Sequence, residues 1–165
     1  SRQDIPVASM CAIEYYEDSL LPLARLYNLE RELDQALQEK IWLKSGGFLI
    51  IQQTEAFVAI DVNTGKHSSK KDAEENYKQI NREAALEIAR QLRLRNLSGM
   101  ILVDFINMKN TNDQSELLQY MGSLVRSDPM QTVVVDVTAL GIMEITRKKS
   151  AKTLAEQLFQ LKKGE

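Results

Sequence analysis

The sequence predicts an α/β fold that could equally be classed as α+β, because we expect a mixed β-sheet with flanking helices. Short apolar runs typical of strands alternate with longer stretches whose apolar residues recur every three or four positions, as on one face of a helix. The expected order is strand, strand, helix, strand, helix, strand, strand, helix. That order indicates a sheet with helices packed against it.

The lead-in, residues 1–44, is expected to be partly helical. Its beginning has no clear period, but in "NLERELDQALQEKIWL" the residues Leu29, Leu33, Ala36 or Leu37, and Ile41 follow one another at spacings of about three or four positions. We therefore expect one helix through this whole stretch. The "SGG" that follows ends it, because glycine is a poor helix former.

The central part begins with two strands, "FLIIQ" (48–52) and "AFVAIDV" (56–62), separated by a connection short enough for a hairpin. A long amphipathic helix is expected over residues 72–95, since its apolar residues change to a helical spacing. "MILVDF" (100–105) is a continuous apolar run, as expected of a buried central strand.

A second helix is expected in "NDQSELLQYMGSLVRSD" (112–128), followed by strands in "QTVVVDV" (131–137) and "GIMEITR" (141–147). Residues 151–165 are expected to form a C-terminal helix. The central part, residues 45–150, then holds most of the strands and both long helices.

The composition limits the classes of function. A chain of 165 residues with formal net charge -2 does not grip nucleic acid through bulk positive charge, so any RNA contact must be local. The single cysteine, Cys11, provides neither an internal disulfide nor a cysteine pair for zinc. No apolar run approaches the roughly 20 residues of a membrane helix, and no signal peptide is evident, so we expect a cytoplasmic protein without membrane contact.

Two aspartates at strand ends are the strongest candidates for chemistry. Asp61 closes "AFVAID" and Asp104 closes "MILVD", with a helix between them long enough for a crossover between parallel strands. Neighbouring parallel strands would bring both carboxylates to one sheet edge, where open α/β sheets bind ligands. Asn63 shares a face with Asp61 by strand alternation and could orient it through a hydrogen bond. From spacing alone, ordinary turn chemistry at the strand ends stays an open alternative.

If the two aspartates do hold a metal, Mg²⁺ is favoured, with Mn²⁺ as a substitute. Mg²⁺ takes one or two carboxylates, keeps several waters and accepts phosphate oxygens. The absence of nearby cysteine argues against zinc. His67, the only histidine, follows the first motif. It is interpreted as an exposed loop residue, with a general-base role as the alternative.

The segments around these residues resemble the ribonuclease E/G family, in its ribonuclease G branch. They are "WLKSGGFLIIQQTEAFVAIDVNTGK", "INREAALEIARQLRLRNLSGMILVDFINM" and "ALGIMEITRKK". The resemblance runs from about residue 29 to 150 in the family's order. It implies a deoxyribonuclease-I-like catalytic domain, here 45–150, of a single-strand-specific endoribonuclease that leaves 5′-phosphate and 3′-hydroxyl ends.

By this resemblance, Asp61 and Asp104 are the Mg²⁺ ligands and Asn63 is an accessory catalytic residue. The chain departs from the family at Asn107, where some members carry a second aspartate. It departs again at 139–141, where "ALG" replaces an arginine-containing segment that helps the E branch bind an RNA 5′ monophosphate.

The resemblance also implies parts that this sequence does not contain. These are an oligonucleotide-binding domain, a 5′-sensing region and a two-cysteine motif that shares zinc between protomers. We expect them in a full-length protein, expect weak or no activity from this chain alone, and leave its oligomeric state open. The alternative function is a non-catalytic RNA-binding or scaffold module with the same fold.

Some basic side chains at the ends of predicted strands are candidates for contact with the RNA backbone. Arg147, Lys148 and Lys149 directly follow or end a predicted strand, and Lys66 follows the first aspartate motif. Lysine and arginine are the usual partners of phosphate. We predict these four as RNA-binding residues.

Overall fold

The computed structural model describes residues 14–65 and 73–163 and divides the chain into two compact units, with the boundary between Gln35 and Ala36. The first unit contains the short helix α1 (Leu23–Leu26) and nearly all of α2 (Leu29–Ala36). Neither helix has a buried residue.

The second unit is built on a six-stranded mixed sheet with the spatial order β1-β2-β3-β4-β6-β5. Strands β3 and β4 are parallel, and every other neighbouring pair is antiparallel. The strands are β1 (Lys40–Trp42), β2 (Phe48–Gln53), β3 (Val58–Asn63), β4 (Gly99–Asp104), β5 (Thr132–Val137) and β6 (Ile142–Arg147).

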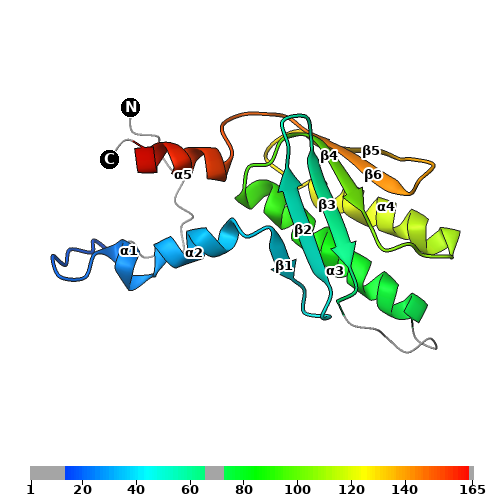
Figure 1. Cartoon of the computed structure of the whole chain (residues 1–165), viewed down its shortest axis with the longest axis horizontal. Helices are drawn as coiled ribbons and strands as arrows, with labels where there is room; N and C mark the ends of the chain where they lie inside the picture. Colours follow the sequence, from blue (N-terminus) through cyan, green and yellow to red (C-terminus); the bar gives the residue numbers. More distant parts are fainter. Residues whose placement is uncertain (1–13, 66–72, 164–165) are drawn as a thin grey trace. The chain divides into compact units, whose positions relative to one another are not determined.

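Helices α3 (Ala73–Leu94) and α4 (Thr111–Val125) lie together on one face of this sheet (Figure 1). Alternate side chains of β3 point into the layer between sheet and helices, so Val58, Ile60 and Val62 are buried. The intervening residues of β3 project from the opposite face, where they are exposed or half-buried. The sheet therefore has one covered face and one open face.

The long helix α3 supplies much of the core. Ile80, Ile88 and Leu92 are fully buried. Ala84 and Ala85, also fully buried, let the helix approach the strands closely because their side chains are small. The apolar spacing that predicted this helix is the spacing of its buried face.

The last helix, α5 (Leu154–Lys163), is tied to the end of α3. The Leu154 amide donates to the Arg95 carbonyl at 2.9 Å, and Asn96 Nδ2 donates to the Lys152 carbonyl at 3.1 Å. Thr153 and Glu156 form a reciprocal capping box, in which each side chain accepts from the other's backbone amide.

The predicted mixed sheet with flanking helices is confirmed, with one error near its start. The helix expected through Ile41 ends at Ala36, and the strand β1 follows it. Ile41 and Trp42 pair with Leu49 and Phe48 of β2. Pairing with β2 thus decides the structure at Ile41, although its spacing from the preceding apolar residues also fits a helix. Within the described ranges, no helix combines the length and apolar character that a membrane span requires.

Candidate metal centre at the carboxyl edge of the sheet

Asp61 and Asp104 are direct register partners on the parallel strands β3 and β4. Both strands run toward the same edge of the sheet, as their arrowheads in Figure 1 show. Adjacent strands are about 4.8 Å apart, and both aspartates lie on the open face, where they are exposed. The predicted juxtaposition of the two carboxylates at one edge is present in the backbone register.

Asn63 donates a hydrogen bond from Nδ2 to Oδ2 of Asp61, at 2.8 Å. The two residues are separated by buried Val62, whose side chain points to the opposite face. This hydrogen bond occupies one carboxylate oxygen and limits rotation of the Asp61 side chain. Asn63 is half-buried, so its own amide is better fixed than that of an exposed side chain.

The donor set suits Mg²⁺, which commonly takes one or two carboxylates and completes its shell with water and substrate phosphate. Among the residues that the structure describes, no three His, Cys, Asp or Glu side chains cluster as a metal site. The pair Asp61 and Asp104 fits an open, water-rich centre that a phosphate can enter.

The loop after Asp104 is held by a buried asparagine on α3. Asn81 is fully buried, donates from Nδ2 to the Ile106 carbonyl at 2.7 Å, and accepts from the Ile106 amide at 3.0 Å. One side chain thus satisfies both backbone groups of the second residue after Asp104. This clamp sets the direction in which the chain leaves β4.

A second residue of α3 holds the loop between β1 and β2. The carboxylate of Glu83 accepts from the Lys44 amide at 2.6 Å and from the Ser45 amide at 2.9 Å. Burial alone would raise the pKa of Glu83, but hydrogen bonds from Ser45 and Lys44 outweigh it and hold that pKa below the ordinary value of 4.5. The carboxylate is therefore ionised in its anchoring role at neutral pH.

Gly65 brings this loop against the end of the Asp61 motif. Its φ is +72°, which side chains rarely adopt, and a Cβ at this position would collide with the Gly46 carbonyl oxygen. The loop glycine Gly47 is constrained by space, since its Cβ would lie 2.8 Å from the Asn63 carbonyl oxygen. The "SGG" and "NTG" segments are thus packed backbone to backbone.

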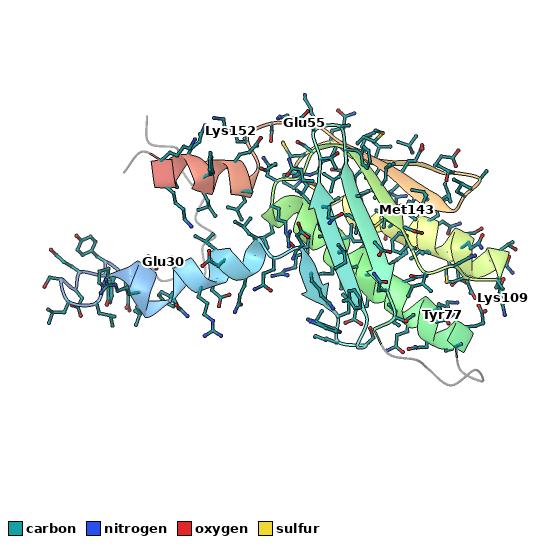
Figure 2. All side chains as sticks on the ribbon, in the orientation of Figure 1. Glu30, Glu55, Tyr77, Lys109, Met143 and Lys152 are labelled. Carbon is teal, nitrogen blue, oxygen red and sulfur yellow. The ribbon has the colours of Figure 1, made fainter. Side chains whose placement is uncertain are left out.

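A hollow of about 300 Å³ opens on the other side of Asp104. Asn107 and Gln114 contribute polar groups, and Leu140 and Met143 contribute apolar surface. Leu140 is 89% exposed, so the hollow has an aliphatic side chain at its solvent side. Tyr77 and Lys109 lie toward this end of the sheet, whereas Glu55 marks the opposite end (Figure 2).

The four predicted RNA-binding residues are placed differently. Arg147 is 4% exposed, and its guanidinium makes a bidentate pair with Asp128, with Nε to Oδ2 at 2.8 Å and Nη2 to Oδ1 at 3.2 Å. Its Nη1 donates to the Leu97 carbonyl at 3.0 Å. The prediction that Arg147 contacts RNA is therefore wrong, because alternation in β6 turns the side chain toward the helices.

Lys148 and Lys149 are exposed and stay predictions. Lys66 and His67 lie outside the described residues.

Sequence reasoning missed Asn81 and Glu83. Both have a signal in the sequence: each lies one position from an apolar residue of the inner stripe of α3, Ile80 or Ala84. A polar side chain at such a position must find partners when the helix packs. Which backbone it would hold depends on the paths of loops distant in the sequence.

Comparison with known proteins bears on this site. The model of the Ribonuclease E/G family matches residues 3–150. Ribonuclease G of Escherichia coli (strain K12) is 40% identical over 137 residues, which are 83% of this chain and 28% of the relative. Ribonuclease E of Nostoc sp. (strain PCC 7120) is 38% identical over 144 residues, 87% of this chain and 21% of the relative. The chain thus spans about a quarter of the length of these relatives.

Proposed function

Because this chain belongs to the ribonuclease E/G family, we propose that the carboxyl edge of its sheet is the hydrolytic centre of a Mg²⁺-dependent endoribonuclease acting on single-stranded RNA. The observation that carries the proposal is the pairing of Asp61 with Asp104 on adjacent parallel strands, with Asn63 bonded to Asp61. The proposal extends to the deoxyribonuclease-I-like character of the domain and to products with 5′-phosphate and 3′-hydroxyl ends.

The residues of the edge divide the work as follows. Asp61 and Asp104 would each present a carboxylate oxygen to one Mg²⁺, and their exposure leaves room for an RNA phosphate beside them. A bound Mg²⁺ supplies charge neutralisation at the phosphate and lowers the pKa of water. Asn63 keeps Asp61 oriented, and the Asn81 clamp keeps the chain beyond Asp104 in place. These contacts are present in the structure without RNA, as preorganised catalysis requires.

RNA affinity has to come from local contacts, because the formal net charge is -2. The cleavage test should therefore use this chain both alone and fused to a single-stranded-RNA-binding domain. The substrate is a 5′-monophosphorylated single-stranded oligonucleotide with Mg²⁺. We expect cleavage by the fusion and loss of cleavage in its Asp61→Asn and Asp104→Asn variants.

A matched control is Asp136→Asn, which removes an exposed aspartate of the same sheet at β5. We expect this variant to cleave normally, because the Asp136 side chain accepts from the neighbouring Val137 amide and lies on the edge strand β5, two strands away from β4. Absence of cleavage by the unmodified fusion would favour the alternative of a non-catalytic RNA-binding or scaffold module. Equal cleavage by Asp104→Asn and the unmodified fusion would refute the assignment of the centre.

The role of Asn63 has a separate test. Groups that orient metal ligands typically change metal affinity or activity by about 10–100-fold when removed. We expect Asn63→Ala to weaken Mn²⁺ binding within that range, measured by titration calorimetry, while Asp136→Asn binds as the unmodified chain does. Unchanged Mn²⁺ affinity in Asn63→Ala would show that the hydrogen bond to Asp61 is incidental.

A further inference from the structure

An exposed aromatic pair lies on the open face of the sheet, on the β1 side of the metal edge. Trp42 and Phe48 have ring centroids 5.2 Å apart with planes tilted by 59°. Trp42 is 63% exposed, which is unusual for the largest apolar side chain, and Phe48 is half-buried. Large exposed aromatic surface that does not join the core commonly marks a binding site.

The sheet register ties this pair to the candidate centre. Trp42 pairs with Phe48, and Phe48 pairs with Asn63, so the three residues form one row across β1, β2 and β3. At about 4.8 Å per strand, the backbone of Trp42 is roughly 10 Å from that of Asn63. A Cβ built on Gly65 would lie 3.6 Å from Cζ3 of Trp42, so the indole also borders the end of the "NTG" turn.

A cation covers the same pair. Lys40 Nζ lies 4.2 Å from the Trp42 ring centroid and 3.8 Å from that of Phe48. In the next register row on the same face of the sheet, Lys40 pairs with Ile50, which pairs with Asp61. An ammonium group and two aromatic rings thus converge within two strands of the proposed hydrolytic centre. Proteins that hold single strands combine these features: bases stack on aromatic rings, and basic side chains follow the phosphates.

We propose that Trp42 and Phe48 form a stacking subsite for one nucleobase of the single-stranded RNA, with Lys40 beside a neighbouring phosphate. The proposal rests on the proposed function, because the metal edge identifies the occupant as RNA. Stacking accepts any base, since every base has a π-face. The subsite therefore adds affinity and fixes the position of the strand across Asp61 and Asp104 without reading a sequence.

The chain contains one tryptophan, so its fluorescence reports on this subsite alone. The experiment titrates the unmodified chain with single-stranded RNA in EDTA at low ionic strength, where no Mg²⁺-dependent cleavage occurs. We expect quenching by single-stranded RNA and much less by the same RNA in a duplex. In a series with one abasic position moved along the strand, we expect the quenching to fall at a defined position. No quenching at saturating RNA, or quenching indifferent to every abasic position, would overturn the proposal.

Substitutions separate stacking from mere support of the fold. Removing a stacking ring weakens single-strand binding by about 5- to 150-fold, so Trp42→Ala and Trp42→Leu should lose affinity in this range by fluorescence anisotropy of labelled RNA. Trp42→Phe, which keeps a ring, should retain most of it. Mn²⁺ affinity should be unchanged in all three variants. If Trp42→Leu binds RNA as well as Trp42→Phe does, the ring is not a subsite.

Lys40→Gln tests the phosphate contact through the salt dependence of binding. Losing one contact to a single strand should reduce the slope of log K against log salt by about 0.7. An unchanged slope would show that Lys40 only covers the two rings. Fluorescence quenching by RNA without any cleavage would support the subsite and refute the proposed hydrolysis. Cleavage that Trp42→Leu does not change would support the hydrolysis and refute the subsite.

Discussion

Replacing Asn81 with leucine removes both hydrogen bonds that hold Ile106, two residues after Asp104. Leucine has nearly the same size, so the change leaves no large cavity and tests the polar contacts. The amide and carbonyl of Ile106 would lose their partners next to a side chain that is fully buried. Each unsatisfied buried group costs about 1–3 kcal/mol. Since Ile106 is only half-buried, water can partly replace the asparagine, and we expect a total loss of about 2–4 kcal/mol.

Urea unfolding followed by circular dichroism measures this loss, with Gln79→Leu as the control. Gln79 is an exposed amide on the same helix, and its replacement should change the free energy of unfolding by less than about 0.5 kcal/mol. In the folded Asn81→Leu variant, we also expect weaker Mn²⁺ binding, because the chain leaving Asp104 loses its clamp. Equal unfolding free energies for the Asn81 and Gln79 variants would refute the reasoning, since the clamp would then contribute nothing.

Three further predictions concern stability, each measured by denaturant unfolding. Arg147→Met should destabilise the protein by about 3–5 kcal/mol because it leaves Asp128 buried without its partner, whereas Lys148→Met, at an exposed neighbouring position, should be nearly neutral. Burial would raise the pKa of Asp128, but its hydrogen bonds with Arg147 and other groups hold that pKa below 3.8. The contribution of Asp128 to the free energy of unfolding is therefore fully present above pH 3.8 and is lost as the pH falls below it. The Asp128→Asn variant should lack this pH dependence. Gly65→Ala should destabilise the protein by about 1–3 kcal/mol because of the positive φ at this position. Gly122→Ala, in open space on α4, should stabilise the protein by about 0.5–1 kcal/mol. A change of the same sign in both variants would contradict this account.

The spacing of apolar residues predicted those helices and strands whose buried residues recur at that same spacing. The apolar face of α3 and the apolar run of β4 lie in the centre of the core. The helical spacing of the first and the unbroken apolar sequence of the second indicate which side chains are buried. Strand β1 escaped prediction because it is an edge strand of three residues, stabilised by pairing with β2. A short segment of this kind carries no period of its own, so its structure is decided by a distant partner.

The candidate site was predictable to the extent that it depends on strand ends. The positions of Asp61 and Asp104 after apolar runs, with a helix between them, were enough to predict that neighbouring parallel strands would bring both to one sheet edge, and alternation placed Asn63 with them. The direction of the Arg147 side chain was misjudged because successive side chains of a strand point to opposite faces, so a shift of one position along β6 exchanges solvent for core. The aromatic row through Phe48 could not be found without the pairing of β1, which the sequence assigned to a helix.

The central claim is that Asp61 and Asp104 share one metal ion. The most direct measurement is an anomalous difference map from crystals of this chain grown with Mn²⁺. The account predicts one peak within coordination distance of a carboxylate oxygen from each aspartate, and its loss in crystals of Asp104→Asn. Carboxylates too far apart to share a peak, or a Mn²⁺ ion bound at full occupancy without contact to either aspartate, would contradict it.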